Sequence, residues 1–189
     1  MNEALQKMQR PALLAAVVGL AATGAGYFMV GREQFFQSYL MAFLYVLGLA
    51  CGSLGFLMIH HLVVARWGLV MQRPLEAATR TFPLLVVLFI PVLLGMSELY
   101  SWTRPEALND HILQKKAAWL NVTGFHIRSV IYFMIWLGFS YLLSHWSQLQ
   151  DQHPDEAKKI ELRMRKLSGI GLVIFGLTVT FAAFDWIMS

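Results

Sequence analysis

Charged residues are missing from five long stretches of this sequence. No Asp, Glu, Lys or Arg occurs in residues 11–31, 34–65, 81–97, 129–150 and 167–184. Over the 189 residues, 14% are charged and 57% are hydrophobic, whereas soluble domains are roughly half apolar. Each stretch is long enough to cross a bilayer as a helix, which takes about 17 to 20 residues. The scarcity of charge therefore excludes an ordinary soluble domain and predicts a membrane protein.

The alternation of polar and apolar residues that marks a membrane β-strand is also absent. We therefore predict an all-α integral membrane protein, a single bundle of about five transmembrane helices with short amphipathic helices at the membrane surfaces. The first stretch resembles a signal peptide after Lys7 and Arg10, but it is longer than a signal core and four more stretches follow. The predicted spans are residues 12–30, 39–64, 82–100, 125–146 and 167–187.

Cysteine is limited to Cys51, which lies inside the second uncharged stretch. A single thiol forms no internal disulfide and supplies too few sulfur ligands for a cysteine-based zinc or iron–sulfur site. We therefore expect this chain to bind no metal through cysteine.

Lys and Arg are divided unevenly between the two sides of the predicted bundle. Ten of the 15 lie on the side of the N-terminus. By the positive-inside rule, the N-terminus is predicted to be cytoplasmic and the C-terminus to face outward, and we call these sides inner and outer. The ten inner residues are Lys7, Arg10, Arg66, Arg73, Arg80, Lys158, Lys159, Arg163, Arg165 and Lys166.

Two loops carry enough apolar residues to predict short helices lying along the membrane surface. In the inner loop "ARWGLVMQRPLEAATRTFP", Glu76 and Arg80 are four residues apart in the order that favours a helical ion pair. This pair is interpreted either as local helix support or as an inner-surface proton or partner contact. The outer loop "SWTRPEALNDHILQKKAAWLN" predicts a second short helix, with Pro105 in its first turn. The second inner loop, residues 147–166, predicts a solvated turn and a helix start without assigned chemistry.

Small residues and one proline predict how the spans pack. Gly48 and Gly52 have the GxxxG spacing that lets two membrane helices approach closely, and Gly55 follows one turn later. Pro91 lies inside the third span, where it removes a backbone hydrogen bond and is expected to kink the helix.

Ionisable residues are absent from the centres of the spans and gather at their rims, whereas ion and proton paths usually carry such groups within the membrane. On the outer side we expect Asp185 to pair with Arg128 or with Glu98 across neighbouring helices. The pair is interpreted as structural or as an entry or exit group for protons or a quinone headgroup. The candidates for proton transfer or quinone contact over both rims are His60, His61, Glu76, Arg80, Glu98, Arg128 and Asp185.

Two adjacent histidines, His60 and His61, occur near the end of the second stretch. With Phe36 and Trp67 as interfacial anchors about 46 Å apart, His60 lies about 10 Å inward from Trp67, at the inner rim. Neighbouring helix residues point about 100° apart, so at most one histidine is expected to face the bundle interior. The interpretations left open are a proton or quinone contact, a helix-end histidine held by a carbonyl or headgroup, and a haem site shared with His145.

Four segments together resemble one known family. They are "SYLMAFLYVLGLACGSLGFLMIHHLVVARWG", "RPLEAATRTFPLLVVLFIPVLLG", "LNVTGFHIRSVIYFMIWL" and "GLTVTFAAFDWIMS". In this order, from Ser38 to Ser189, they are similar to the N-terminal half of the F-type membrane subunits of alternative complex III, a bacterial quinol:electron-acceptor oxidoreductase. These subunits are related to the polysulfide-reductase-type membrane subunits. Family members continue after the motif matching "DWIMS" with a second set of helices, so we expect the first half of a longer architecture.

The resemblance implies a non-catalytic, multi-pass subunit of a respiratory complex in a bacterial inner membrane. It implies no haem or iron–sulfur cluster on this chain, with quinol as a possible ligand. The implied partners are a sister polysulfide-reductase-type membrane subunit, an iron–sulfur subunit and multihaem cytochrome c subunits; the family's quinol site lies in the sister subunit. Two other classes stay open from the residues: half of a transporter lined by the kinked third helix, and a small b-type cytochrome.

Overall fold

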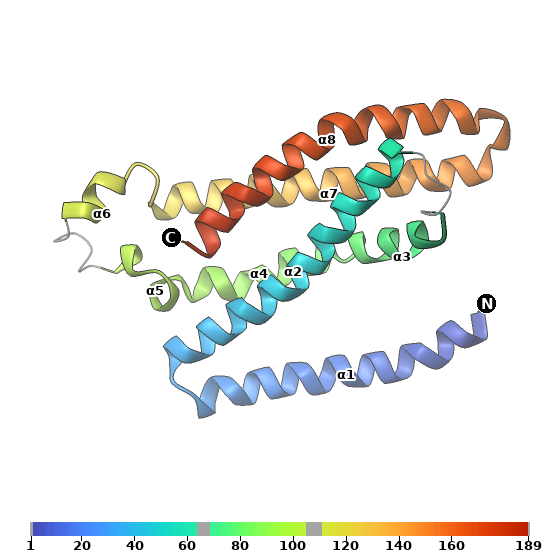
Figure 1. The fold of residues 1–189 in the computed structure, drawn as a ribbon. Coiled ribbons are helices and arrows are strands. Elements are labelled where there is room, and N and C mark those ends of the chain that lie inside the picture. The colour runs from blue at the N-terminus through green and yellow to red at the C-terminus, as the bar shows by residue number, and fades with distance from the viewer. Residues whose placement is uncertain (1, 64–68, 105–110, 189) are drawn as a thin grey trace.

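Helices make up the described part of the chain, which is residues 2–63, 69–104 and 111–188 of the computed structural model, and no strand occurs there (Figure 1). Five helical segments are long and apolar enough to cross a membrane, so the predicted all-α membrane bundle is confirmed. The long helices are α1 (Asn2–Met29), α2 (Arg32–Val63), α4 (Phe82–Leu94), α7 (Val122–Gln152) and α8 (Ala157–Trp186). The short ones are α3 (Leu69–Thr79), α5 (Met96–Leu99), η2 (Ser101–Thr103), α6 (His111–Lys116) and η4 (Pro154–Glu156).

The bundle consists of α2, α4, α7 and α8. Helices α7 and α8 run antiparallel and are joined through η4, while α2 crosses them and packs on α8, α3 and α4 (Figure 1). Aromatic rings pack inside the bundle from its middle to its outer end. The Phe89 and Trp186 ring centres are 4.8 Å apart, and the Phe133 and Trp136 centres are 5.7 Å apart. These large buried side chains supply the apolar contacts that hold the helices together and leave the centre without charge.

Helix α1 stands apart from this bundle (Figure 1). From Gln9 to Val30 every residue is exposed except for Gly26, which is partly covered. The contacts near the junction with α2 are aromatic: the Tyr27 ring meets the rings of Phe35 and Phe36 at centre distances of 5.3 and 6.4 Å. The apolar surface of α1 therefore suits lipid or another membrane helix rather than water.

The third segment long and apolar enough to cross a membrane is Met71–Leu94, which joins most of α3 to α4, so it begins and ends earlier than the predicted 82–100. Helix α4 has 13 residues, about 20 Å of rise, and ends at Leu94, one turn after Pro91. Pro91 offers no N–H to the preceding turn, and the Gly95 N–H closes the helix on the Pro91 carbonyl at 2.9 Å. The chain restarts as α5 one residue later.

The glycine contacts also differ from the prediction. A side-chain carbon at Gly48 or Gly52 would meet nothing within 4 Å, so the GxxxG pair does not pack against the described helices. Close approaches occur instead at Gly55, where such a carbon would lie 3.2 Å from the Phe175 ring, at Gly171, 2.9 Å from the Phe139 ring, and at Gly95 against the Phe36 ring. A sequence motif shows that a helix can be approached closely, but it does not say which face the neighbour occupies.

Both surface loops contain the short helices that the sequence predicts. Helix α3 forms in the inner loop and packs against α2 and α7, and α6 forms in the outer loop. Pro105 and the anchor Trp67 lie outside the described residues. The second inner loop contains the short turn η4 before α8, as predicted, while α7 continues further than expected, to Gln152.

Candidate functional site

An outer cluster of four residues, Trp119, Arg128, Tyr132 and Asp185, surrounds one buried carboxylate. Asp185 is completely buried, and Arg128 binds it in a fork, with Nε donating to Oδ2 and Nη2 to Oδ1, both at 2.8 Å. The Tyr132 hydroxyl donates to Oδ2 at 2.8 Å and the Trp119 indole N–H to Oδ1 at 2.9 Å. The predicted pairing of Asp185 with Arg128 is therefore confirmed.

The surroundings of the outer cluster hold both members of the ion pair in place. The Arg128 guanidinium lies over the Trp119 ring at 4.3 Å, a cation–π contact. Next to Asp185, the Trp186 indole N–H donates to Ser129 Oγ at 3.1 Å and the Trp186 carbonyl accepts from the Tyr100 hydroxyl at 3.1 Å. The lone pairs of Asp185 meet donors from α7 and from the outer loop, which hold the carboxylate in one position.

The other proposed partner, Glu98, is placed elsewhere. It is half-buried and lines a separate outer hollow of about 420 Å³ with Arg32 and Pro91. Among the described residues, no contact joins Glu98 to Asp185. Helix α4 ends before Glu98, so the residue belongs to the short α5 and not to the face that meets α8.

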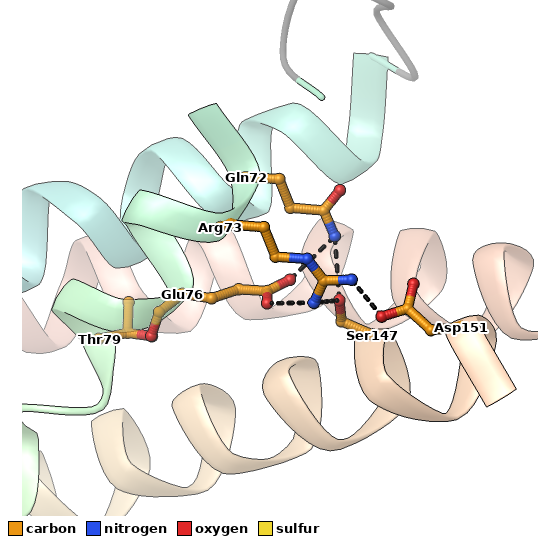
Figure 2. A network of polar contacts seen from close by, with 6 residues as sticks. All are labelled: Gln72, Arg73, Glu76, Thr79, Ser147 and Asp151. Carbon is orange, nitrogen blue, oxygen red and sulfur yellow. Dashed lines mark hydrogen bonds and ion pairs between the residues drawn. The ribbon is translucent and has the colours of Figure 1, made fainter. Parts of the chain in front are cut away.

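At the opposite end of the bundle, a second polar network surrounds Glu76 (Figure 2). We define the inner cluster as His60, His61, Gln72, Arg73, Glu76, Ser147 and Asp151. Glu76 is 2% exposed, yet it accepts hydrogen bonds from Gln72 Nε2 at 2.9 Å and from Arg73 Nη1 at 3.0 Å. Gln72 also donates to Ser147 Oγ at 3.1 Å, and Arg73 binds Asp151 at the surface.

The predicted pairing of Glu76 with Arg80 is wrong. Helix α3 ends at Thr79, so Arg80 lies in the turn before α4 and its side chain is exposed. Arg73, three residues before Glu76, takes the carboxylate instead. Both spacings suit a helix, and the Arg80 backbone N–H still bonds the Glu76 carbonyl at 3.2 Å, but it is the Arg73 side chain that reaches the carboxylate.

The expectation that only one histidine faces the interior is also wrong. His60 is 8% and His61 7% exposed, and their ring centres are 5.5 Å apart. The two rings still project from different faces of α2, but at this level α2 packs on α3 as well as on α8. As predicted, both lie in the last turn of α2, and His61 is within electrostatic range of Glu76.

Each buried histidine keeps one ring nitrogen without a partner. His60 Nδ1 and His61 Nε2 are enclosed and make no hydrogen bond to any described residue. An unpaired polar atom in a buried place is costly, so such atoms mark positions for a water, a proton or a ligand. The inner cluster thus combines a bound carboxylate with unsatisfied imidazoles.

Serines continue the polar surface along α7. Ser140, Ser144 and Ser147 are buried and follow the i, i+4, i+7 spacing of one helix face. Ser140 donates to the Thr79 carbonyl at 2.9 Å, which ties α7 to the end of α3, and Ser144 Oγ has no partner among the described residues.

His145 is not part of the inner cluster. Its ring is exposed and stacks on Tyr141, with centres 5.9 Å apart, and in the described part of the chain no contact joins it to His60 or His61. The residues proposed for a shared haem site are therefore not brought together.

Several residues of both clusters were missed from sequence alone. Trp119 and Tyr132 were not assigned to Asp185, and Arg73 and Asp151 were treated as loop charges. One signal was available for Tyr132, which lies one turn after Arg128 on the same helix face. No local pattern indicates Asp151, because its partner is 78 residues away in the chain.

Comparisons with known proteins add no information on either polar cluster. No family model matches the chain, and no curated protein sequence matches it.

Proposed function

We propose that this chain is a membrane subunit of a bacterial respiratory quinol:electron-acceptor oxidoreductase, of the alternative complex III type. In this role it anchors redox partners in the cytoplasmic membrane and handles protons at its inner end. Electrons pass through c-type haem and iron–sulfur clusters on partner subunits, and a sister membrane subunit lies beside it. It does not catalyse quinol oxidation alone.

The observation that carries the proposal is where the resembling segments lie. The resemblance covers Ser38 to Ser189, and this part of the chain forms the packed bundle, while α1, before Ser38, stands outside it. The same segments supply His60 and His61, Glu76, Arg128 and Asp185, the central residues of both polar clusters. The resembling segments thus include the central residues of both clusters, while Gln72, Trp119, Ser147 and Asp151 lie outside them.

The inner cluster is suited to a proton relay that reaches part of the way into the membrane. Asp151 and Arg73 are about half exposed and touch the buried Glu76 network, and His61 lies within electrostatic range of Glu76. Carboxylates and imidazoles exchange protons readily near neutral pH. Beyond His60 the core is apolar, so the relay needs a neighbouring subunit or water to continue.

A transporter half is supported less well. A substrate path needs polar or hollow space near the middle of the membrane, and the interior of this bundle below the outer cluster is filled by the rings of Phe89, Phe133 and Trp136.

The test is purification of the tagged chain from its native membrane in mild detergent. Co-purification of c-type haem, seen by its absorbance, together with an iron–sulfur protein is the expected result. A lone colourless chain that moves solute in vesicles would contradict the proposal and favour a transporter, and a b-type absorbance in the isolated chain would favour a small cytochrome.

A further inference from the structure

A pocket of about 480 Å³ opens at the inner rim, apart from the inner cluster. It lies where the turn after α3 meets the last third of α7. Its lining includes Arg80 and Pro83 on one side and Ser140, Ser144, His145 and Gln148 on the other. This volume is within the usual range of small-molecule sites.

The pocket presents donors and one unused positive charge. Because Arg73 occupies the Glu76 carboxylate, Arg80 keeps its guanidinium for another partner, and among the described residues it makes no ion pair. Ser144 is 6% exposed, and its hydroxyl has no hydrogen-bond partner in the described part of the chain. An exposed guanidinium beside a hydroxyl, an imidazole and an amide suits an anionic oxygen group such as a phosphate.

The position of the pocket indicates where that phosphate comes from. Arg80 stands immediately before α4, whose first turns carry the exposed apolar side chains of Leu84 and Val87. On α7, Tyr141 and Met134 are each 69% exposed and continue the apolar surface away from the pocket toward the membrane centre. A ligand with a phosphate and apolar chains can bind the polar pocket with its phosphate and the apolar surface of α4 and α7 with its chains. Free phosphate can bind only the polar pocket.

We propose that this pocket binds the headgroup phosphate of an anionic phospholipid from the inner leaflet, with its acyl chains along α4 and α7. Arg80 binds the phosphate, Ser144 and Gln148 donate hydrogen bonds to its oxygens, and His145 borders the headgroup. This inference goes beyond the proposed respiratory role and does not depend on it.

The test titrates the purified full chain, in detergent, with phosphatidylglycerol or phosphatidylcholine and counts bound lipid by native mass spectrometry. Arg80→Gln should weaken phosphatidylglycerol binding about tenfold, Ser144→Ala about threefold, and Arg80→Lys least. The matched control is Arg165→Gln, which removes an exposed arginine of α8 and should bind like the unchanged chain. Circular dichroism shows whether each variant keeps its helix content.

Selective retention of phosphatidylglycerol that depends on Arg80 supports the proposal. Equal binding by Arg80→Gln and the unchanged chain would overturn it, and so would equal binding of phosphatidylcholine. If inorganic phosphate alone binds with the same dependence on Arg80 and displaces the lipid, the site takes a free anion and the lipid assignment is wrong.

Discussion

The two ends of this bundle treat a buried carboxylate differently. At the outer end, Asp185 meets a bidentate guanidinium, a phenol and an indole, and each donor is within 2.9 Å. At the inner end, Glu76 meets Arg73 and Gln72, but Arg73 is itself about half exposed and divided between two carboxylates. A bidentate buried pair is rigid, while an exposed cation that is shared between two carboxylates holds each of them less firmly.

The neighbouring residues sharpen this difference. Around Asp185, Ser129 and Trp186 bond each other and Tyr100 bonds the Trp186 carbonyl, while the indole N–H of Trp102, which stacks on Tyr100, has no partner among the described residues. Around Glu76, His60 and His61 each keep an enclosed nitrogen without a partner in the described residues. We infer that the outer cluster locks α7 to α8, and that the inner cluster is where protons are exchanged.

The largest expected effect is on stability and comes from Arg128→Leu. It removes the bidentate guanidinium that binds the fully buried Asp185, and breaking such a buried pair costs about 3–5 kcal/mol. Unfolding in detergent, followed by circular dichroism, measures the change. The double variant Arg128→Leu with Asp185→Leu should recover much of the loss, because it removes the unpaired charge. A double variant less stable than the single one would mean that the Arg128–Asp185 pair does not hold α7 to α8.

Glu76→Gln should affect the reaction rather than the fold. The amide keeps the shape of the side chain but cannot accept and release a proton, so quinol oxidation by the assembled complex should fall about tenfold or more. Stability should fall by only about 1–2 kcal/mol, since Arg73 still binds Asp151. Asp155→Asn is the control, because it removes an exposed inner carboxylate outside the cluster. An unchanged rate for Glu76→Gln would show that the inner cluster carries no protons.

The two histidines should differ when each is replaced by Ala. His61 lies within electrostatic range of Glu76, so its loss should slow turnover several-fold more than the loss of His60. Both changes open a comparable cavity, which makes each the control for the other in stability measurements. Steady-state turnover at equal complex concentration checks the order. Equal turnover rates and equal losses of stability for the two variants would mean that both histidines serve only to pack the helices.

The smallest expected effect belongs to Asp151→Asn. The Arg73–Asp151 pair is more than half exposed on both sides, and exposed ion pairs contribute about 0–1 kcal/mol. Thermal unfolding at low and high salt should show a small loss that high salt removes. A loss as large as that of Arg128→Leu would mean that the inner cluster is as rigid as the outer one.

Much of the fold was predictable because membrane-spanning helices can be recognised in the sequence as long stretches without charged residues. The five spans, both surface helices and the Asp185–Arg128 pair follow from charge counts and rim positions. The ion pair was predictable because two opposite charges at the same depth in lipid have few alternatives to meeting.

The inner cluster was less predictable because it depends on a tertiary contact. The burial of both His60 and His61 follows from α3 folding back against α2, and Arg73 rather than Arg80 binds Glu76 where α3 meets Ser147 and Asp151 of α7. Neither event leaves a local pattern. The predicted close packing at Gly48 and Gly52 was wrong for the same reason, because the spacing of glycines in a sequence does not show which face of the helix meets a neighbour.

The most direct test of the contrast between the two ends compares Glu76→Gln with Asp185→Asn in the assembled complex, measuring both the amount assembled and the quinol turnover of each assembled complex. We predict that Glu76→Gln assembles at near-normal levels but turns over slowly, while Asp185→Asn assembles poorly but turns over at the normal rate. The reverse pattern, slow turnover for Asp185→Asn and normal turnover for Glu76→Gln, would contradict the account.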